Sequence, residues 1–207
     1  MSDKIAALIA EVEEEGTLEE VRRALDEGAG PLSLVEALRE GMSVVGDKYE
    51  AKEYFLPDLI ISAEIFKEAI ALIEPRLQGG NSATKGAVVI GTVHGDIHDI
   101  GKNIVATMLR CNGYDVHDLG VDVPPQSFVN KASQTQAGLV AMSGLLTLGF
   151  DAMKDTVDAL AEAGLKDKLK IIIGGGSVNE KVLEYCRADA FGKNPTEAVR
   201  LADRYMG

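Results

Sequence analysis

Apolar residues in the first part of the chain recur every three or four positions, which is the spacing of one face of a helix. The first stripes consist of Ile5, Leu8, Ile9 and Val12, and then of Leu18, Val21 and Leu25. After a break at residues 28–31 the pattern resumes over residues 32–45, and Pro57 opens a further helix. Short loops between such helices predict an antiparallel four-helix bundle.

From residue 85 onward the pattern changes to an alternation of strands and helices. The apolar runs that predict strands are residues 87–92, 115–119, 139–142, 170–173 and 188–191. The helical patterns between and after them cover residues 101–111, 125–135, 150–163, 178–186 and 195–205. This alternation predicts an α/β fold with a doubly wound parallel sheet of five strands, of the flavodoxin-like or Rossmann-like type.

A Gly-Gly-Asn-Ser-Ala-Thr segment at residues 79–84 separates the two patterns and has the composition of a flexible linker. We therefore expect a helical domain over residues 1–84 and an α/β domain over residues 85–207, with a hinge at residues 79–82. The negative charge is concentrated in the first domain: residues 1–85 carry 18 acidic and 9 basic side chains, while residues 86–207 carry 15 and 12.

Composition excludes several classes of function. A formal net charge of −12 argues against nucleic-acid binding, which requires a basic face. The sequence has no apolar run of 18 residues and no signal sequence over residues 1–10, so we expect a cytoplasmic protein that does not enter a membrane. Cys111 and Cys186 have neither metal-site nor disulfide-framework spacing, and we expect reduced core thiols.

The candidate chemistry lies in the loop that follows the first predicted strand. This loop reads Gly95, Asp96, Ile97, His98, Asp99, Ile100 and Gly101. Loops at this point of a doubly wound sheet bind ligands. A carboxylate two residues before a histidine can fix the tautomer and the orientation of an imidazole that binds a metal. His98 is therefore the predicted metal ligand, and Asp96 its orienting partner.

Two other interpretations of this loop stay open at this point. A phosphoesterase-type centre also uses a Gly-Asp-x-His segment, but it requires additional carboxylate, Asn and His ligands, and the only other histidines are His94 and His117. The simplest alternative is a polar turn whose histidine is solvated.

Two further loops follow at characteristic distances. After Gly101, 41 residues precede Ser143-Gly144-Leu145, and 28 more precede Gly174-Gly175-Gly176. Each of these segments ends an apolar run, so one ligand lying across the carboxyl ends of parallel strands would contact all three loops. Glycines allow a bulky group to approach the backbone, and a serine hydroxyl can satisfy its polar atoms.

This pattern, Asp-x-His-x-x-Gly followed by Ser-x-Leu and Gly-Gly, resembles the cobalamin (B12)-binding corrinoid proteins of methyltransferase systems, and is similar to the cap and cobalamin-binding domains of methionine synthase. The resemblance implies a cobalamin or related corrinoid whose own base is removed from cobalt and replaced by His98. It also implies that the displaced nucleotide tail runs beside Ser143 and Leu145 and over Gly174 and Gly175.

One position departs from the methionine synthase pattern. Gly149 stands where that branch of the family has a serine that completes a His-Asp-Ser relay. We therefore expect Asp96 to use a water molecule, Thr147 or a backbone group in place of this serine.

Residues 45–57 resemble the cap helices that cover the upper face of cobalt in the same family. Tyr49 and Leu56 occupy the positions of the aromatic residue and the leucine that shield the reactive ligand. The alternative is that both are ordinary residues of the bundle core.

The predicted cap and cobalamin domains account for all 207 residues and leave no room for a catalytic module. The resemblance thus implies a non-catalytic methyl carrier, loaded by a substrate:corrinoid methyltransferase from a methyl ether, methanol, methylamine or betaine. It further implies a second methyltransferase that uses tetrahydrofolate or a thiol as acceptor, and a reductive activase. The alternatives are a cobalamin-dependent sensor and a B12-binding subunit of another corrinoid enzyme.

Overall fold

The computed structural model describes residues 2–76 and 84–207. The chain folds as two compact units, and the main division along the sequence falls between residues 83 and 84. Most of the predicted linker, including the hinge at residues 79–82, lies outside the described residues. In the parts that the structure describes, no helix is both long enough and apolar enough to cross a bilayer.

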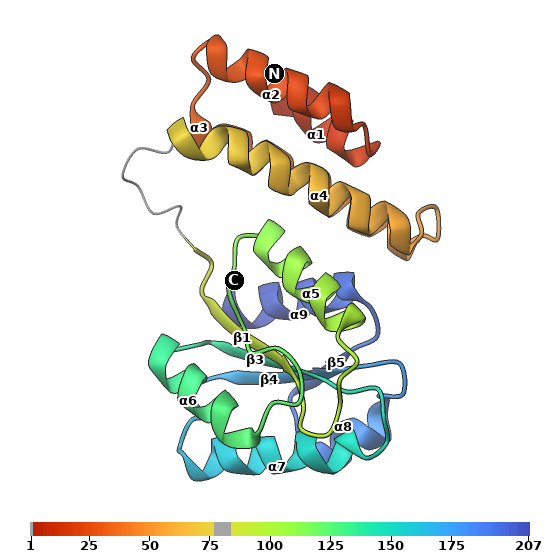
Figure 1. Cartoon of the computed structure of the whole chain (residues 1–207), viewed down its shortest axis with the longest axis vertical. Coiled ribbons are helices and arrows are strands. Elements are labelled where there is room, and N and C mark those ends of the chain that lie inside the picture. Colours follow the sequence, from red (N-terminus) through yellow and green to blue (C-terminus); the bar gives the residue numbers. More distant parts are fainter. Residues whose placement is uncertain (1, 77–83) are drawn as a thin grey trace. The chain divides into compact units, whose positions relative to one another are not determined.

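The first unit consists of the four predicted helices, followed by one short 3-10 turn (Figure 1). Its elements are α1 (Ser2–Ala10), α2 (Glu14–Asp26), α3 (Pro31–Glu50), α4 (Leu56–Ile73) and η1 (Glu74–Arg76). The helices α1 and α4 both pack against α3, and α2 packs against α4. The apolar stripes form a buried core, whose largest members are Ile5, Ile9, Leu34, Leu38, Met42, Leu59, Ile65 and Ile73.

The first helix ends earlier than its apolar stripe predicts. Val12 was expected on the helical face, but it has a left-handed backbone with φ of 58°. The amide of Val12 donates to the carbonyl of Ile9, and the amide of Glu13 donates to the carbonyl of Leu8, at 3.0 Å each. This is the Schellman arrangement that ends a helix, here with a valine where glycine is usual.

The second unit contains the predicted all-parallel sheet of five strands, in the order β2-β1-β3-β4-β5. The strands are β1 (Ala87–Thr92), β2 (Asp115–Asp118), β3 (Leu139–Ser143), β4 (Lys170–Gly174) and β5 (Ala190–Gly192). The helices are α5 (Ile100–Cys111), α6 (Pro125–Thr135), α7 (Gly149–Glu162), α8 (Glu180–Cys186) and α9 (Pro195–Met206). Because β1, β3 and β4 are covered on both faces, they read as continuous apolar runs.

Helices α5 and α9 cover one face of the sheet, and α6, α7 and α8 cover the other (Figure 1). The face under α6, α7 and α8 is filled by a cluster that includes Phe128, Met153 and Val182. Strand β1 lies between β2 and β3 in the sheet. Helix α5 connects β1 to β2 across one face, and α6 connects β2 to β3 across the other. The strand order thus reverses beside β1, which opens a crevice at the carboxyl ends of β1 and β3.

Both cysteines are buried, and neither forms a disulfide bond, as expected. Burial raises the pKa of the Cys186 thiol to about 11, so this thiol is protonated at neutral pH.

Candidate functional site

Asp96 and His98 lie together in the loop between β1 and α5. Oδ1 of Asp96 accepts two hydrogen bonds from His98, one from its backbone amide at 2.9 Å and one from its Nδ1 at 2.7 Å. Oδ2 of Asp96 accepts the amides of Leu145 at 2.6 Å and Leu146 at 3.0 Å. The carboxylate therefore joins the loop after β1 to the loop after β3.

The charge state of Asp96 determines the tautomer of His98. Full burial of Asp96 acts to raise its pKa, but the hydrogen bonds from His98, Leu146 and Leu145 outweigh this effect and bring the pKa down to about 2. An ionised carboxylate can only accept hydrogen bonds, so Nδ1 of His98 carries the proton. Nε2 then keeps its lone pair on a side chain that is 48% exposed and can bind a metal.

The position of the missing relay serine lies beside this carboxylate. A Cβ atom on Gly149 would be 3.7 Å from Oδ2 of Asp96. Of the three groups expected to replace the serine, backbone groups occupy this role in the structure. The amides of Leu145 and Leu146 both donate to Oδ2 of Asp96. Thr147 is exposed, and within the described part of the chain it is not among the groups that donate to the Asp96 carboxylate.

Asp122 holds the same loop from the other side, and the sequence analysis did not identify it. Its Oδ1 accepts the Gly95 amide at 2.8 Å and lies 2.7 Å from Nδ1 of His94, while its own amide donates to the Asp96 carbonyl at 3.0 Å. Asp122 has a left-handed backbone with φ of 52°, which Asp tolerates better than most residues. Asp122 follows β2 closely, and the carboxyl ends of parallel strands lie at one edge of the sheet. This position could have indicated that Asp122 lies near the site.

Lys102 was also missed. Its side chain is only 3% exposed, in the first turn of α5, and its ammonium pairs with the carboxylate of Asp118 at the end of β2. Asp118 also accepts the Gly120 amide at 2.9 Å through its second oxygen. A buried lysine is stable only when it is paired, so this contact fixes the start of α5 directly after His98.

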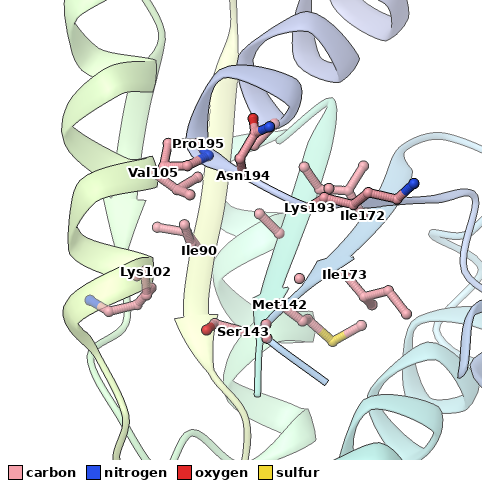
Figure 2. Close-up of a pocket in the computed structure, with 17 residues that line it drawn as sticks. Ile90, Lys102, Val105, Met142, Ser143, Ile172, Ile173, Lys193, Asn194 and Pro195 are labelled. Atoms are coloured by element: carbon pink, nitrogen blue, oxygen red, sulfur yellow. The ribbon is translucent and has the colours of Figure 1, made fainter. Parts of the chain in front are cut away.

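A cavity of about 190 Å³ opens between α5, α9 and the sheet (Figure 2). Four predicted residues line it, namely Gly101, Ser143, Gly174 and Gly175. The segment from Lys193 to Pro195 at the start of α9 also lines it and was not predicted. Figure 2 shows the Lys102 stem at one wall, with the ammonium directed away from the cavity.

Gly175 is required by its surroundings. It has φ of 141°, and a Cβ atom there would lie 2.0 Å from the carbonyl oxygen of Gly144. Only glycine permits this close approach of the loops that follow β3 and β4. Where these two loops meet, the cavity wall therefore consists of glycines, which leave room for a bulky ligand close to the backbone.

The other predicted loop residues do not line this cavity. Leu145 is partly exposed, and its carbonyl accepts the Ser177 hydroxyl at 2.6 Å. Ile97 and Ile100 are 71% and 74% exposed, so both present apolar surface at the crevice edge. Asp99 accepts the Asn103 side-chain amide at 3.0 Å within the first turns of α5.

Tyr49 and Leu56 lie in the helical unit, on either side of the connection from α3 to α4. Tyr49 is half-buried in the last turn of α3, and Leu56 is the first residue of α4 and is 38% exposed. The neighbouring Phe55 is more exposed still. Leu56 is therefore not a core residue of the bundle, contrary to the alternative interpretation.

The described residues contain no group of three or more His, Cys, Asp or Glu side chains that could hold a metal ion. His94 pairs with Asp122, and Nε2 of His117 lies 3.1 Å from Asp115. A single oriented imidazole fits a metal that brings its other ligands in a macrocycle, as a corrinoid does. It does not fit the ligand set of a two-metal phosphoesterase.

Comparison with known families agrees with this geometry. A model described as B12 binding domain matches residues 86–200, and a second model with the same description matches residues 1–74. Together they cover both units.

Individual relatives match over almost the whole chain. Dimethylamine corrinoid protein 3 of Methanosarcina acetivorans is 35% identical over 98% of this chain and 95% of its own. Trimethylamine corrinoid protein 1 of the same organism is 38% identical, over 92% and 90%. A solved cobalamin-binding protein from Desulfitobacterium hafniense is 37% identical with a TM-score of 0.86, over 100% and 99%. The methanol:cobalamin methyltransferase complex of Methanosarcina barkeri matches at 35% identity and TM-score 0.86, over 98% and 78%.

Proposed function

Because the chain belongs to the family of B12-binding corrinoid proteins, we propose that it is the methyl carrier of a multi-component methyltransferase system. A first methyltransferase loads the methyl group, and a second passes it to tetrahydrofolate or a thiol. The names of the relatives favour a methylated amine or methanol as donor over a methyl ether or betaine. We also propose that a reductive activase is a partner of this protein, and that the protein is cytoplasmic.

When bound, the corrinoid supplies the cobalt chemistry of methyl transfer, and the protein supplies ligation, orientation and exclusion of water. His98 would bind the cobalt through Nε2. Asp96 holds the imidazole by its Nδ1 and favours the tautomer whose Nε2 has a free lone pair. The amides of Leu145 and Leu146 keep Asp96 ionised. The proposal depends chiefly on one observation, namely that the Asp96 carboxylate accepts four hydrogen bonds and one of them orients His98.

The remaining residues hold the rest of the cofactor. The cavity lined by Ser143, Gly174 and Gly175 would accept the displaced nucleotide tail. Ile97 and Leu145 offer exposed apolar surface to the corrin ring. Tyr49 and Leu56 would shield the reactive ligand of the bound cofactor, since exclusion of water protects it.

The test is spectroscopic and needs no partner enzyme. We expect the Co(II) holoprotein to show electron-paramagnetic coupling to one axial nitrogen, and His98→Ala to lose it while still binding the corrinoid. His94→Ala is the matched control and should keep the coupling. If the coupling persists in His98→Ala, the ligand assignment is wrong. Transfer of methyl from methylated amines or methanol to the wild-type holoprotein by candidate methyltransferases then tests the carrier function.

A further inference from the structure

A second histidine beside a carboxylate lies at the carboxyl edge of the sheet, and the proposed function does not use it. His94 comes shortly after β1, and Nδ1 of its imidazole lies 2.7 Å from Oδ1 of Asp122, which comes shortly after β2. The His94 side chain is 65% exposed, and within the described residues it has no partner besides Asp122. The pair thus has the same composition as Asp96–His98, an imidazole whose Nδ1 faces a carboxylate.

The sheet fixes the positions of both side chains. Val93 and Val123 form a parallel bridge beyond β1 and β2, and His94 and Asp122 are their neighbours in sequence. The amide of Val123 donates to the carbonyl of Thr92 at 3.0 Å, so the strand pairing continues up to the two side chains. An imidazole that is held in place before a ligand arrives loses little entropy when it binds one.

The charge of Asp122 decides which nitrogen of His94 carries a proton. The hydrogen bond from the Gly95 amide, together with the neighbouring His94 side chain, holds the pKa of the Asp122 carboxyl below its usual range. An ionised carboxylate can only accept hydrogen bonds, so a contact of 2.7 Å requires the proton on Nδ1. Nε2 of the neutral imidazole is then an acceptor, and it suits a ligand that offers an N–H group.

A corrinoid bound to His98 would offer such groups, because a corrin ring carries amide side chains around its rim. His94 and His98 lie on one loop, and the amide of Asp122 donates to the carbonyl of Asp96 at 3.0 Å, which joins the two pairs. A macrocycle bound at its centre extends over the loop around that point, so its rim is the part that can reach His94. The cavity, by contrast, is lined by β1, β3 and β4, whereas Asp122 follows β2 on the other side of β1.

We propose that His94 is a further cofactor-binding residue, whose Nε2 accepts a hydrogen bond from an amide side chain at the rim of the corrin ring, and that Asp122 is the positioning residue that orients it. The inference rests on the proposed function, because it concerns the same cofactor. If this amide is replaced by a carboxylate, the N–H donor is lost and two acceptors face each other. Such a corrinoid should therefore bind less tightly.

The experiment combines a change in the protein with a change in the cofactor. Cobalamin, and cobalamins in which one rim amide is hydrolysed to a carboxylate, are titrated by absorbance at about pH 8, where a free imidazole is neutral. The proteins are the wild type, His94→Ala and His117→Ala. His117 is the matched control, because its Nε2 lies 3.1 Å from a carboxylate of Asp115 but the residue belongs to β2 itself.

We expect one of the monocarboxylates to lose roughly threefold to tenfold more affinity, relative to cobalamin, in the wild type than in His94→Ala. His117→Ala should behave as the wild type does. The effect of the added charge alone is common to all three proteins, so it cancels in this comparison. Equal losses in the wild type and His94→Ala for every monocarboxylate would overturn the inference.

A further variant tests the role of Asp122. Asp122→Asn keeps a side-chain oxygen for the Gly95 amide, but a neutral amide can donate to Nδ1 of His94 or accept from it, so the tautomer is no longer fixed. We expect the extra loss of affinity to shrink in this variant. An unchanged loss would overturn the positioning role of Asp122.

These outcomes can be told apart from a failure of the proposed function. His94→Ala leaves Asp96 and His98 intact, so its Co(II) holoprotein should keep the axial-nitrogen coupling whether or not His94 contacts the rim. Failure of the wild type to bind any of these corrinoids would instead overturn the proposed function, and the inference with it.

Discussion

The amide of Leu145 donates a 2.6 Å hydrogen bond to Oδ2 of Asp96, across 49 residues of sequence. The carboxylate that orients His98 is thus held from the loop after β3. In consequence, one hydrogen-bonded network joins the imidazole of His98 to the loop after β3, at the edge of the cavity.

Replacing Asp96 by Asn should disrupt this hydrogen-bonded network. The amide group brings two donors to a position that four donors surround, so at least one N–H loses its partner. We expect a loss of about 2–3 kcal/mol in the free energy of unfolding, measured by urea denaturation. Asp99→Asn, in the same loop, is the control and should cost less than about 1 kcal/mol. Equal losses of unfolding free energy in the two variants would show that the four hydrogen bonds to Asp96 contribute no special stability.

Restoring the absent serine should be tolerated. Gly149 has no left-handed backbone, and its Cβ would lie 3.4 Å from Val93 and 3.7 Å from Asp96. We expect Gly149→Ser to fold and to be more stable than Gly149→Ala by about 0.5–1 kcal/mol, because only Ser can donate to Oδ2. Thermal denaturation of the two variants measures this difference. If Ser is no more stable than Ala, its hydroxyl does not reach the carboxylate.

The two glycines after β4 should respond very differently to alanine. At Gly175 the new methyl group would meet the Gly144 carbonyl in a strained backbone conformation, whereas at Gly176 the nearest atom is a Leu145 methyl at 3.4 Å. We expect Gly175→Ala to cost about 3 kcal/mol or more, and Gly176→Ala less than about 1 kcal/mol. Denaturant midpoints provide the comparison. A mild Gly175→Ala would mean that the two loops can separate at little cost.

Acid should weaken the helical unit through Glu20. This side chain is buried, and hydrogen bonds from Arg23 and Lys4 hold its pKa below the usual 4.5. A lowered pKa stabilises the fold at pH values above 4.5, and this contribution is lost as the pH falls through the folded-state value. Glu20→Gln should therefore lower the melting temperature at pH 7 and have a smaller effect near pH 3. Glu64→Gln, on the exposed surface, should show no such pH dependence.

Truncation of the predicted shield should expose the reduced cofactor. Leu56→Ala removes a side chain that contributes little to the bundle core, so the protein should fold normally. We expect a shorter lifetime of reduced cobalt in trace oxygen, followed by absorbance in the holoprotein. Ile61→Ala, similarly exposed on the same helix, is the control. Identical lifetimes in both variants would make Leu56 an ordinary surface residue.

Within the described residues, local sequence patterns were sufficient to predict each α-helix and each strand, though not the short 3-10 turn η1, because burial on one or both faces gives a clear periodicity of apolar residues. Val12 is the exception, since an apolar residue after a helix looks like a continuation until the turn is known. The pair Asp96–His98 could be predicted because its members are two residues apart. Asp122 and the start of α9 could not, because they reach the site only through the order of strands in the sheet.

The hydrogen bonds from Leu145 and Leu146 have a consequence for how the protein acquires its cofactor. A fragment containing only β1 and α5 would include both Asp96 and His98, yet it would lack the two amides that satisfy Oδ2. We therefore expect that the proposed site can bind cobalt only after the distant strand β3 has paired with β1. A nascent chain should stay inert toward corrinoids until residue 146 has emerged and folded, so loading follows synthesis of the central sheet.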